Sequence, residues 1–406
     1  MARLALPAVP SDADLAAFAH ACFKTTRWDE LIAAARDLPF SASGPRGEFF
    51  DAVCFAHTQR HQLKAALDLG RQLQSEPNRR RDVSLAYVCY LSLLSGEDLA
   101  GATRDELKRE FLLLTARTLD ANPDHVTALY RLGTFYAEIE SARDKKALEI
   151  FRRAIEIYER LDPSAQRRDH RFFKPYVKSL YAGARSALRL ERWDWAKYLS
   201  ARCLRLDAET EFIAPMFKLY QAAAALTGAG EHARAEKGLR LALEAKGPRD
   251  RAFIHDRLAL TLARQDNVPG AIEWLETHVP AHQRPSYIWV HLGDLQYARR
   301  RTAAARLAWE ASLRGDRIAR HLTLCRLGEL ALAEGRLPQA RAHFEEACHF
   351  RKKRHQASDP RALKGLLALA TRAGDALEVQ RLSNELARLG TAAEPSHPRG
   401  GHDRVA

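Results

Sequence analysis

The sequence predicts an all-α protein that is built from stacked helical hairpins, on two observations. Leucine-glycine pairs such as Leu292-Gly293 and Leu327-Gly328 recur at a spacing of roughly 34 residues, the length of a two-helix repeat. The composition favours Leu, Ala, Arg and Glu and lacks the Val-, Ile- and Thr-rich runs that strands need. We therefore expect the 406 residues to form a continuous array of about nine or ten hairpins.

The N-terminal part of the chain, residues 1–123, is predicted to hold degenerate hairpins. Apolar residues at helical spacing occupy 28–35 and 50–73, and a further pair of helices is expected at 83–94 and 107–119. A long polar insertion separates the members of that second pair.

Residues 124–390 are predicted to form clearer hairpins. Asp124 can cap a helix that places Gly133 on its apolar face, and the next helix presents Ala147 and Phe151. We expect Gly133 to let the paired helix approach closely, with Ala147 at the crossing point. Six further hairpins are expected at 180–188 with 193–203, 219–226 with 235–242, 258–262 with 271–275, 289–293 with 305–309, 324–328 with 340–347, and 363–370 with 379–389.

Prolines and glycines mark the borders of these elements. A proline at or just before a first turn costs no hydrogen bond, because the first N–H groups of a helix have no intrahelical acceptor. Residues 391–406 are rich in both residue types and are predicted to be a disordered tail. The prolines expected at first turns are Pro123, Pro175, Pro215, Pro285 and Pro360.

The clearest hairpin carries the pattern L-x2-L-G-x2-Y followed by A-x3-F-x2-A. It resembles the tetratricopeptide repeat (TPR), with Leu129 where that motif has tryptophan. The resemblance is strongest over 124–389. It implies a right-handed α-solenoid superhelix, in which the first helix of each hairpin lines a concave groove that holds a partner.

The TPR resemblance also implies which side chains face the groove. The residue after the early core position then gives a ladder of Tyr130, Tyr181 and Tyr220, unless these tyrosines only fill space between helices. Aromatic rings flanked by cations suit an acidic peptide segment. The asparagines that carboxylate-clamping TPR proteins use do not occur at the required places. The other predicted groove residues are Thr134, Lys178, Arg185 and Phe217, followed by Asp256, Asp294 and Glu329 in later repeats.

The net charge of +13 leaves three classes of function open. Nearly all of the basic surplus lies in 151–406, where it can attract nucleic acid or an acidic protein. Most of the basic residues are Arg, so the surplus also fits a GC-rich coding sequence. The prediction is a protein-protein scaffold or adaptor whose partner is another protein or peptide segment. The alternatives are a ligand-responsive regulatory sensor and an RNA-binding helical-repeat protein.

Catalytic and targeting signals are missing from the sequence. It contains no nucleophile elbow, P-loop, dinucleotide fingerprint or zinc-protease motif. The densest histidine and acid cluster, near 343–355, is predicted to be a solvated helix face. We therefore predict no enzyme activity, no cofactor and no metal. The widely spaced cysteines and the lack of a signal peptide or membrane span predict a cytoplasmic protein.

Overall fold

A computed structural model describes residues 6–7, 9–96, 102–140, 143–161, 170–315, 320–355 and 358–391. Within these ranges every regular element is helical, which confirms the all-α fold of stacked hairpins. The chain separates into two compact units, 1–186 and 187–406. The change expected near residue 123 falls inside the first unit. The predicted tail lies outside the described residues from 392 onward.

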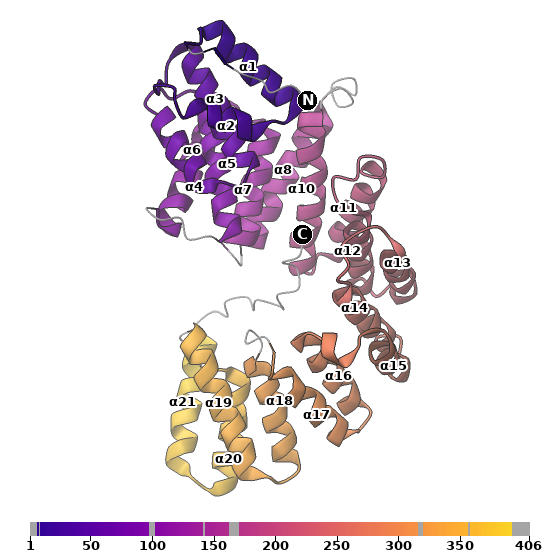
Figure 1. The fold of residues 1–406 in the computed structure, drawn as a ribbon. Helices are drawn as coiled ribbons and strands as arrows, with labels where there is room; N and C mark the ends of the chain where they lie inside the picture. The colour runs from indigo at the N-terminus through magenta and orange to yellow at the C-terminus, as the bar shows by residue number, and fades with distance from the viewer. Residues whose placement is uncertain are drawn as a thin grey trace. The chain divides into compact units, whose positions relative to one another are not determined.

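Unit 1 consists of helices that pack against their neighbours in sequence (Figure 1). Its first helix starts with a capping box, in which the backbone N–H of Asp14 donates to Ser11 Oγ and the backbone N–H of Ser11 donates to the Asp14 carboxylate. The helices are α1 (Asp12–Thr25), α2 (Trp28–Ala35), α3 (Gly44–Gln59), α4 (Leu63–Leu73), α5 (Arg79–Ser95), α6 (Arg104–Ala121), α7 (Val126–Thr134), the π-helical turn η1 (Phe135–Ile139), α8 (Asp144–Arg160) and α10 (His170–Arg189), whose end extends past residue 186.

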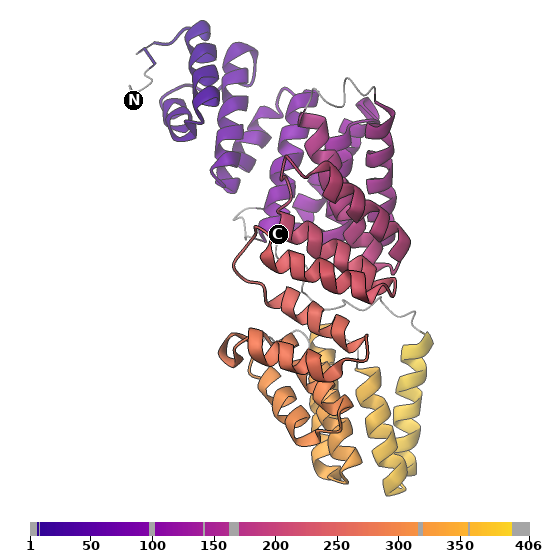
Figure 2. The same ribbon diagram turned by 90° about the vertical axis from the view of Figure 1, so that its right-hand side faces the viewer.

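Unit 2 continues the same pattern of paired helices, which is clearest in the turned view of Figure 2. Its helices are α11 (Trp193–Leu206), α12 (Pro215–Gly228), α13 (His232–Glu244), α14 (Ala252–Ala263), α15 (Val268–His278), the short η2 (Ala281–Gln283), α16 (Ser286–Ala298), α17 (Thr302–Ser312), α18 (Arg320–Ala333), α19 (Leu337–His355), α20 (Pro360–Ala373) and α21 (Ala376–Thr391).

The turn between the two helices of a hairpin has the same geometry at most places along the chain. One residue takes a positive φ, and the next donates its N–H to the carbonyl five residues earlier, as Arg301 N does to Gln296 O at 3.0 Å. This is the Schellman arrangement, which usually requires glycine at the left-handed position. Here that position holds glycine at 230, 335 and 374, but elsewhere it holds Thr26, His61, Glu191, Asp266 and Arg300.

Non-glycine turns explain where the sequence misjudged the first hairpins. The apolar stretch 50–73 was expected as one element, but a turn at His61, with φ 55°, divides it into α3 and α4. The helix α1 was not expected at all. In the first two hairpins the left-handed turn residue is Thr26 or His61 rather than a glycine, whereas α5 ends at Gly96 with φ 68°.

Glycines on the first helices lie directly against aromatic rings of the second helices. A Cβ added to Gly133 would lie 2.5 Å from Cε1 of Phe151, and one added to Gly293 would lie 2.4 Å from Cδ1 of Trp309. The close approach that the sequence predicted at Gly133 is confirmed. The residue that meets it is the large Phe151 rather than Ala147, because a flat ring fits the space that a missing side chain leaves.

Two helix starts differ from the sequence prediction. Pro175 lies inside α10, one turn beyond its start at His170, and Ser179 Oγ donates to the carbonyl of Pro175 at 2.8 Å. The helix α7 is capped by His125, whose Nδ1 accepts from the N–H of Ala128 at 3.2 Å, and not by Asp124. At α7 the cap is therefore a residue that the usual capping preferences do not favour.

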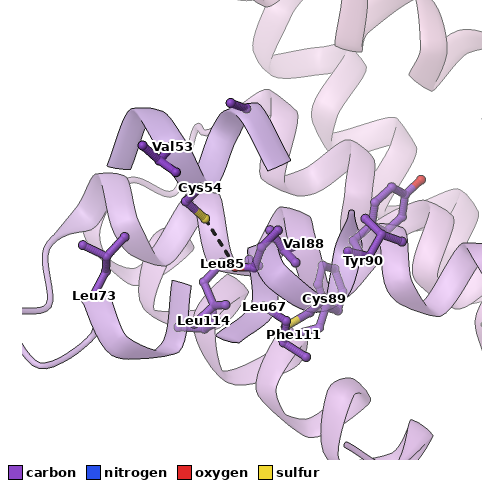
Figure 3. Packing of buried hydrophobic residues seen from close by; sticks show 14 of the residues in the cluster. Val53, Cys54, Leu67, Leu73, Leu85, Val88, Cys89, Tyr90, Phe111 and Leu114 are labelled. Atoms are coloured by element: carbon purple, nitrogen blue, oxygen red, sulfur yellow. Dashed lines mark hydrogen bonds between the residues drawn. The ribbon is translucent and has the colours of Figure 1, made fainter. Parts of the chain in front are cut away.

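The core of unit 1 lies between α3, α4, α5 and α6 (Figure 3). The thiol of Cys54 donates to the carbonyl of Ala66 at 3.4 Å, and burial raises the pKa of this thiol to about 12, so it stays protonated. Tyr90 lies at the edge of the cluster, and Figure 3 shows its phenol oxygen pointing away from the leucines. The hydroxyl of Tyr90 lies near Tyr130, which belongs to the candidate site.

Candidate functional site

The residues predicted to line a groove all lie on first helices of hairpins. They also divide between the two units, so that the tyrosine ladder has Tyr130 and Tyr181 in unit 1 and Tyr220 in unit 2. The full set is Tyr130 and Thr134 on α7, Lys178, Tyr181 and Arg185 on α10, Phe217 and Tyr220 on α12, Asp256 on α14, Asp294 on α16, and Glu329 on α18.

In unit 1, Tyr130 is half-buried and is held by neighbours on α5 and α7. Burial raises the pKa of Tyr130, while the nearby hydroxyls of Thr134 and Tyr90 act in the opposite direction. The Oγ1 atom of Thr134 also donates to the carbonyl of Tyr130 at 3.0 Å. The three hydroxyl groups therefore form one polar cluster between α5 and α7.

Arg131 extends this cluster, although the sequence analysis did not single it out. Its guanidinium carbon lies 3.9 Å from the ring centroid of Tyr87, and Nη1 donates weakly to the carbonyl of Val83 at 3.5 Å. Burial lowers the pKa of Arg131, while the nearby phenols act in the opposite direction. No feature of the sequence distinguishes this arginine from the many others, because its surroundings come from α5.

On α10, Lys178 is half-buried and close enough to Arg131 to be affected by its charge. Burial, followed by the charges of Lys174 and Arg131, lowers the pKa of Lys178. About two turns further along α10, Arg185 forms an ion pair with Glu138. Glu138 belongs to η1, and π-helical turns of this kind are frequent at functional sites.

In unit 2, the aromatic residues of the face contact each other. Phe217 is buried and stacks on Phe253 with ring centroids 6.2 Å apart, while the half-buried Tyr220 meets Phe253 edge-on at 4.8 Å. The guanidinium of Arg257 lies 5.9 Å from the Tyr220 ring. These contacts fix the orientation of Tyr220.

The predicted acidic residues of unit 2 are each paired with a basic residue, a histidine or an arginine, on the next first helix. Asp256 meets His291 at 2.7 Å, and Arg326 donates two parallel hydrogen bonds to Asp294 at 2.5 and 2.7 Å. Glu329 is paired in the same way. The partner follows the acid by 35 residues for Asp256, and by 32 for Asp294 and for Glu329, whose partner is Arg361.

These ion pairs connect successive hairpins through their first helices, and a bidentate arginine-carboxylate pair also fixes geometry. A spacing of one repeat between acid and base was present in the sequence and was the signal that could have predicted them. The acidic character expected for this face is therefore largely neutralised by the protein itself.

A second feature of unit 2 that the sequence analysis missed is a group of stacked rings on α14 and α15. The rings of Trp274 and His278 stack with centroids 3.7 Å apart, and His255 lies 5.6 Å from His278. Burial lowers the pKa of His255 to about 4, with a smaller contribution from the charge of His278. His255 is therefore neutral in the folded protein at neutral pH.

The geometry of the hairpins decides the type of repeat. Gly133, Gly293 and Gly328 each receive an aromatic ring from the second helix of the same hairpin. The residues that pair in this way stand at the glycine and the large second-helix position of the TPR pattern. The packing inside these hairpins therefore resembles that of the tetratricopeptide repeat.

No protein-family model matches the sequence, and a search of curated proteins finds no match. Among solved structures, the chain is similar to the human IFIT1 dimer with PPP-AAAA, at 14% identity and a TM-score of 0.46, over 93% of this chain and 82% of that one.

Bacterial TPR proteins are also among the similar structures. One from Parabacteroides merdae has 15% identity and a TM-score of 0.43, over 71% of this chain and 92% of that one. The C-terminal part of a TPR repeat-containing protein from Cytophaga hutchinsonii has 14% identity and a TM-score of 0.42, over 66% and 97%. In the described part of this chain no helix is both long and apolar enough to cross a membrane.

Proposed function

We propose that this protein is a non-catalytic scaffold or adaptor that holds a segment of a partner protein along the first helices of its hairpins. The observation that carries the proposal is that Tyr130, Tyr181 and Tyr220 are all half-buried on these helices. A half-buried tyrosine combines a large ring with a polar hydroxyl, and such residues dominate the energetics of protein interfaces.

The rigidity of the face supports the same proposal. Bidentate contact between Arg326 and Asp294 holds two successive first helices of unit 2 together. A surface that is formed before binding loses little conformational entropy when a partner docks on it. All six cysteines are free thiols, as expected for the cytoplasmic location that we include in this proposal.

The test is a triple Tyr→Ala variant at positions 130, 181 and 220. Tyr198→Ala is the matched control, because Tyr198 lies on the second helix α11 and is 45% exposed. Wild type and both variants would be used to capture partners from the native host after nuclease treatment. The captured proteins would be quantified by mass spectrometry, and thermal melting would be measured in parallel.

We expect the triple variant to lose its partner while it melts close to the wild type. Each interface tyrosine contributes about 1–2 kcal/mol to binding, so three truncations should weaken capture by a factor of roughly a hundred to ten thousand. A large drop in melting temperature with intact capture would show that the tyrosines only pack between helices. Capture that disappears with nuclease treatment in the wild type would favour the RNA-binding alternative.

A further inference from the structure

Arg131 and Lys178 form a pair of half-buried cations on neighbouring first helices of unit 1. Arg131 on α7 and Lys178 on α10 each lie seven residues before a member of the Glu138–Arg185 ion pair, which joins these two parts of the chain, and the charge of the arginine contributes to the lowered pKa of the lysine. Two like charges at such a place repel each other, and each also loses part of its hydration. The charged form of Lys178 is therefore less favourable in the folded protein than in water.

No carboxylate within the described part of the chain forms an ion pair with either cation. The groups that affect Arg131 are the phenols of Tyr87, Tyr90 and Tyr130, and those that affect Lys178 are other cations. Other cations of the first helices behave differently: Arg185 is paired with Glu138, and in unit 2 Arg326 is paired with Asp294. Arg131 and Lys178 differ from these two arginines because no acid among the described residues forms an ion pair with them.

The position of Glu138 explains why Arg185 has an acidic partner and Arg131 has none among the described residues. Glu138 lies seven residues after Arg131, in the π-helical turn that follows α7. That turn directs Glu138 to Arg185 on α10, and this ion pair engages its carboxylate.

Tyrosines surround the cation pair on the side of α5. The rings of Tyr87 and Tyr90 stack with centroids 6.5 Å apart, and the guanidinium of Arg131 lies over Tyr87. The phenol of Tyr90 points out of the core cluster (Figure 3) and interacts with Tyr130. Phenols are hydrogen-bond donors, and together with a guanidinium fork they match the lone pairs of a single carboxylate.

We propose that Arg131, Lys178, Tyr87, Tyr90 and Tyr130 form a binding site for the side-chain carboxylate of an aspartate or glutamate in a partner's peptide segment. This cationic site rests on the proposed scaffold function and specifies the chemistry of the segment. The site offers one anionic position, because the next cation along α10, Arg185, is already neutralised. A nucleic-acid backbone would need a series of free cations instead.

The experiment uses the full chain and a fluorescein-labelled decaglutamate peptide with a blocked, amidated C-terminus. Fluorescence anisotropy would give the Kd of the wild type, of Lys178→Met and of Arg131→Met. Lys145→Met is the matched control, because it removes the same charge from an exposed position on α8. Decalysine and a ten-residue oligouridylate serve as comparison probes, and each variant is also melted.

We expect decaglutamate to bind in a salt-dependent manner and Lys178→Met to raise its Kd about tenfold, since a partly desolvated ion pair is lost. Lys145→Met should stay within about twofold, and decalysine should not bind. Lys178→Met should melt at or above the wild-type temperature, because its cation is unfavourable in the free protein. Arg131→Met should weaken binding in the same direction, so the inference does not depend on one variant.

Several results would overturn the site. These are no binding of decaglutamate by the wild type, an unchanged Kd for Lys178→Met, or binding that requires a free C-terminal carboxylate. Tighter binding of oligouridylate with the same dependence on Lys178 would overturn the peptide assignment. If native capture depends on the tyrosines but decaglutamate fails, only the cationic site is wrong. If decaglutamate binds through Lys178 but no native protein is captured, only the scaffold function is wrong.

Discussion

Replacing Gly328 by leucine tests the packing on which the repeat assignment depends. A Cβ at this position would lie 2.6 Å from Cε1 and 2.8 Å from Cδ1 of Phe344, which is about 1 Å closer than ordinary van der Waals contact. The Phe344 ring is fully buried and cannot retreat, because a Cβ on Gly365, on its other side, would lie only 2.4 Å from Cζ. The two helices must therefore separate.

The magnitude follows from two opposing effects. Overpacking of a well-packed core costs about 1–3 kcal/mol, and the absence of free space on both sides of Phe344 places Gly328→Leu near the upper limit. Leucine forms helix more readily than glycine, which returns about 0.8 kcal/mol. We expect a net loss of about 2 kcal/mol, or a fall of roughly 4–8 °C in the melting temperature of unit 2.

The assay is thermal and urea unfolding followed by circular dichroism. Ala333→Leu is the control, because it adds a leucine to an exposed position on the same helix and should change stability by less than about 0.5 kcal/mol. Adding Phe344→Leu to Gly328→Leu should recover part of the loss, since the two side chains compete for the same space. An unchanged melting temperature, or strictly additive effects of the two substitutions, would refute the repeat register.

Three further predictions concern unit 2, each measured by urea unfolding. The folded protein resists protonation of His255, whose pKa is about 4, so the protein loses stability as pH falls below about 6.5. His255→Leu should reduce this loss by at most about 3 kcal/mol. The same loss of stability in the variant and the wild type would contradict the prediction. The carboxylate of Asp256 outweighs burial and raises the pKa of His291. The ion pair therefore stabilises the protein below about pH 6.5, and this contribution is lost as pH rises through the folded pKa. His291→Gln should remove this pH dependence, and a variant that kept it would show that the pair is not its source. Arg300→Gly should raise the free energy of unfolding by about 1 kcal/mol, because φ is 59° at this turn and glycine adopts that conformation without strain. Gly335→Ala should lower the free energy of unfolding by a similar amount, and changes of the opposite sign would show that the turns are not strained.

The helical part of the fold could be predicted because its signal lies within each hairpin. Gly133 and Phe151 contact each other across a single turn region, so a pattern of small and large residues encodes the contact directly. The turns could not be predicted in the same way. Residues such as Glu191 and Arg300 adopt a left-handed conformation because the packed helices on both sides determine it, and local preference is overridden.

The candidate site was only partly predictable for a related reason. Position in the repeat placed Tyr130 and Lys178 on first helices, but the sequence did not show which charges find partners. Asp294 is neutralised by a residue one repeat later, and Glu138 is redirected by a π-helical turn. Arg131 was missed because its significance depends on Tyr87, which belongs to a different hairpin.

The ion pairing of the first-helix cations shows how much of the net positive charge of the chain is available to a ligand. Net charge pointed to residues 151–406, yet in unit 2 the first-helix cations Arg326 and Arg361 are bound to acids of the preceding hairpin. Arg131 lies in the part of the chain that is close to neutral overall, and it has no acid among the described residues. A ligand responds to the charge that remains after internal pairing, so the local shortage of carboxylates around Arg131 and Lys178 is a better guide to binding than the total of +13. For that reason a single substitution at Lys178 should affect an acidic peptide more than the loss of several exposed arginines.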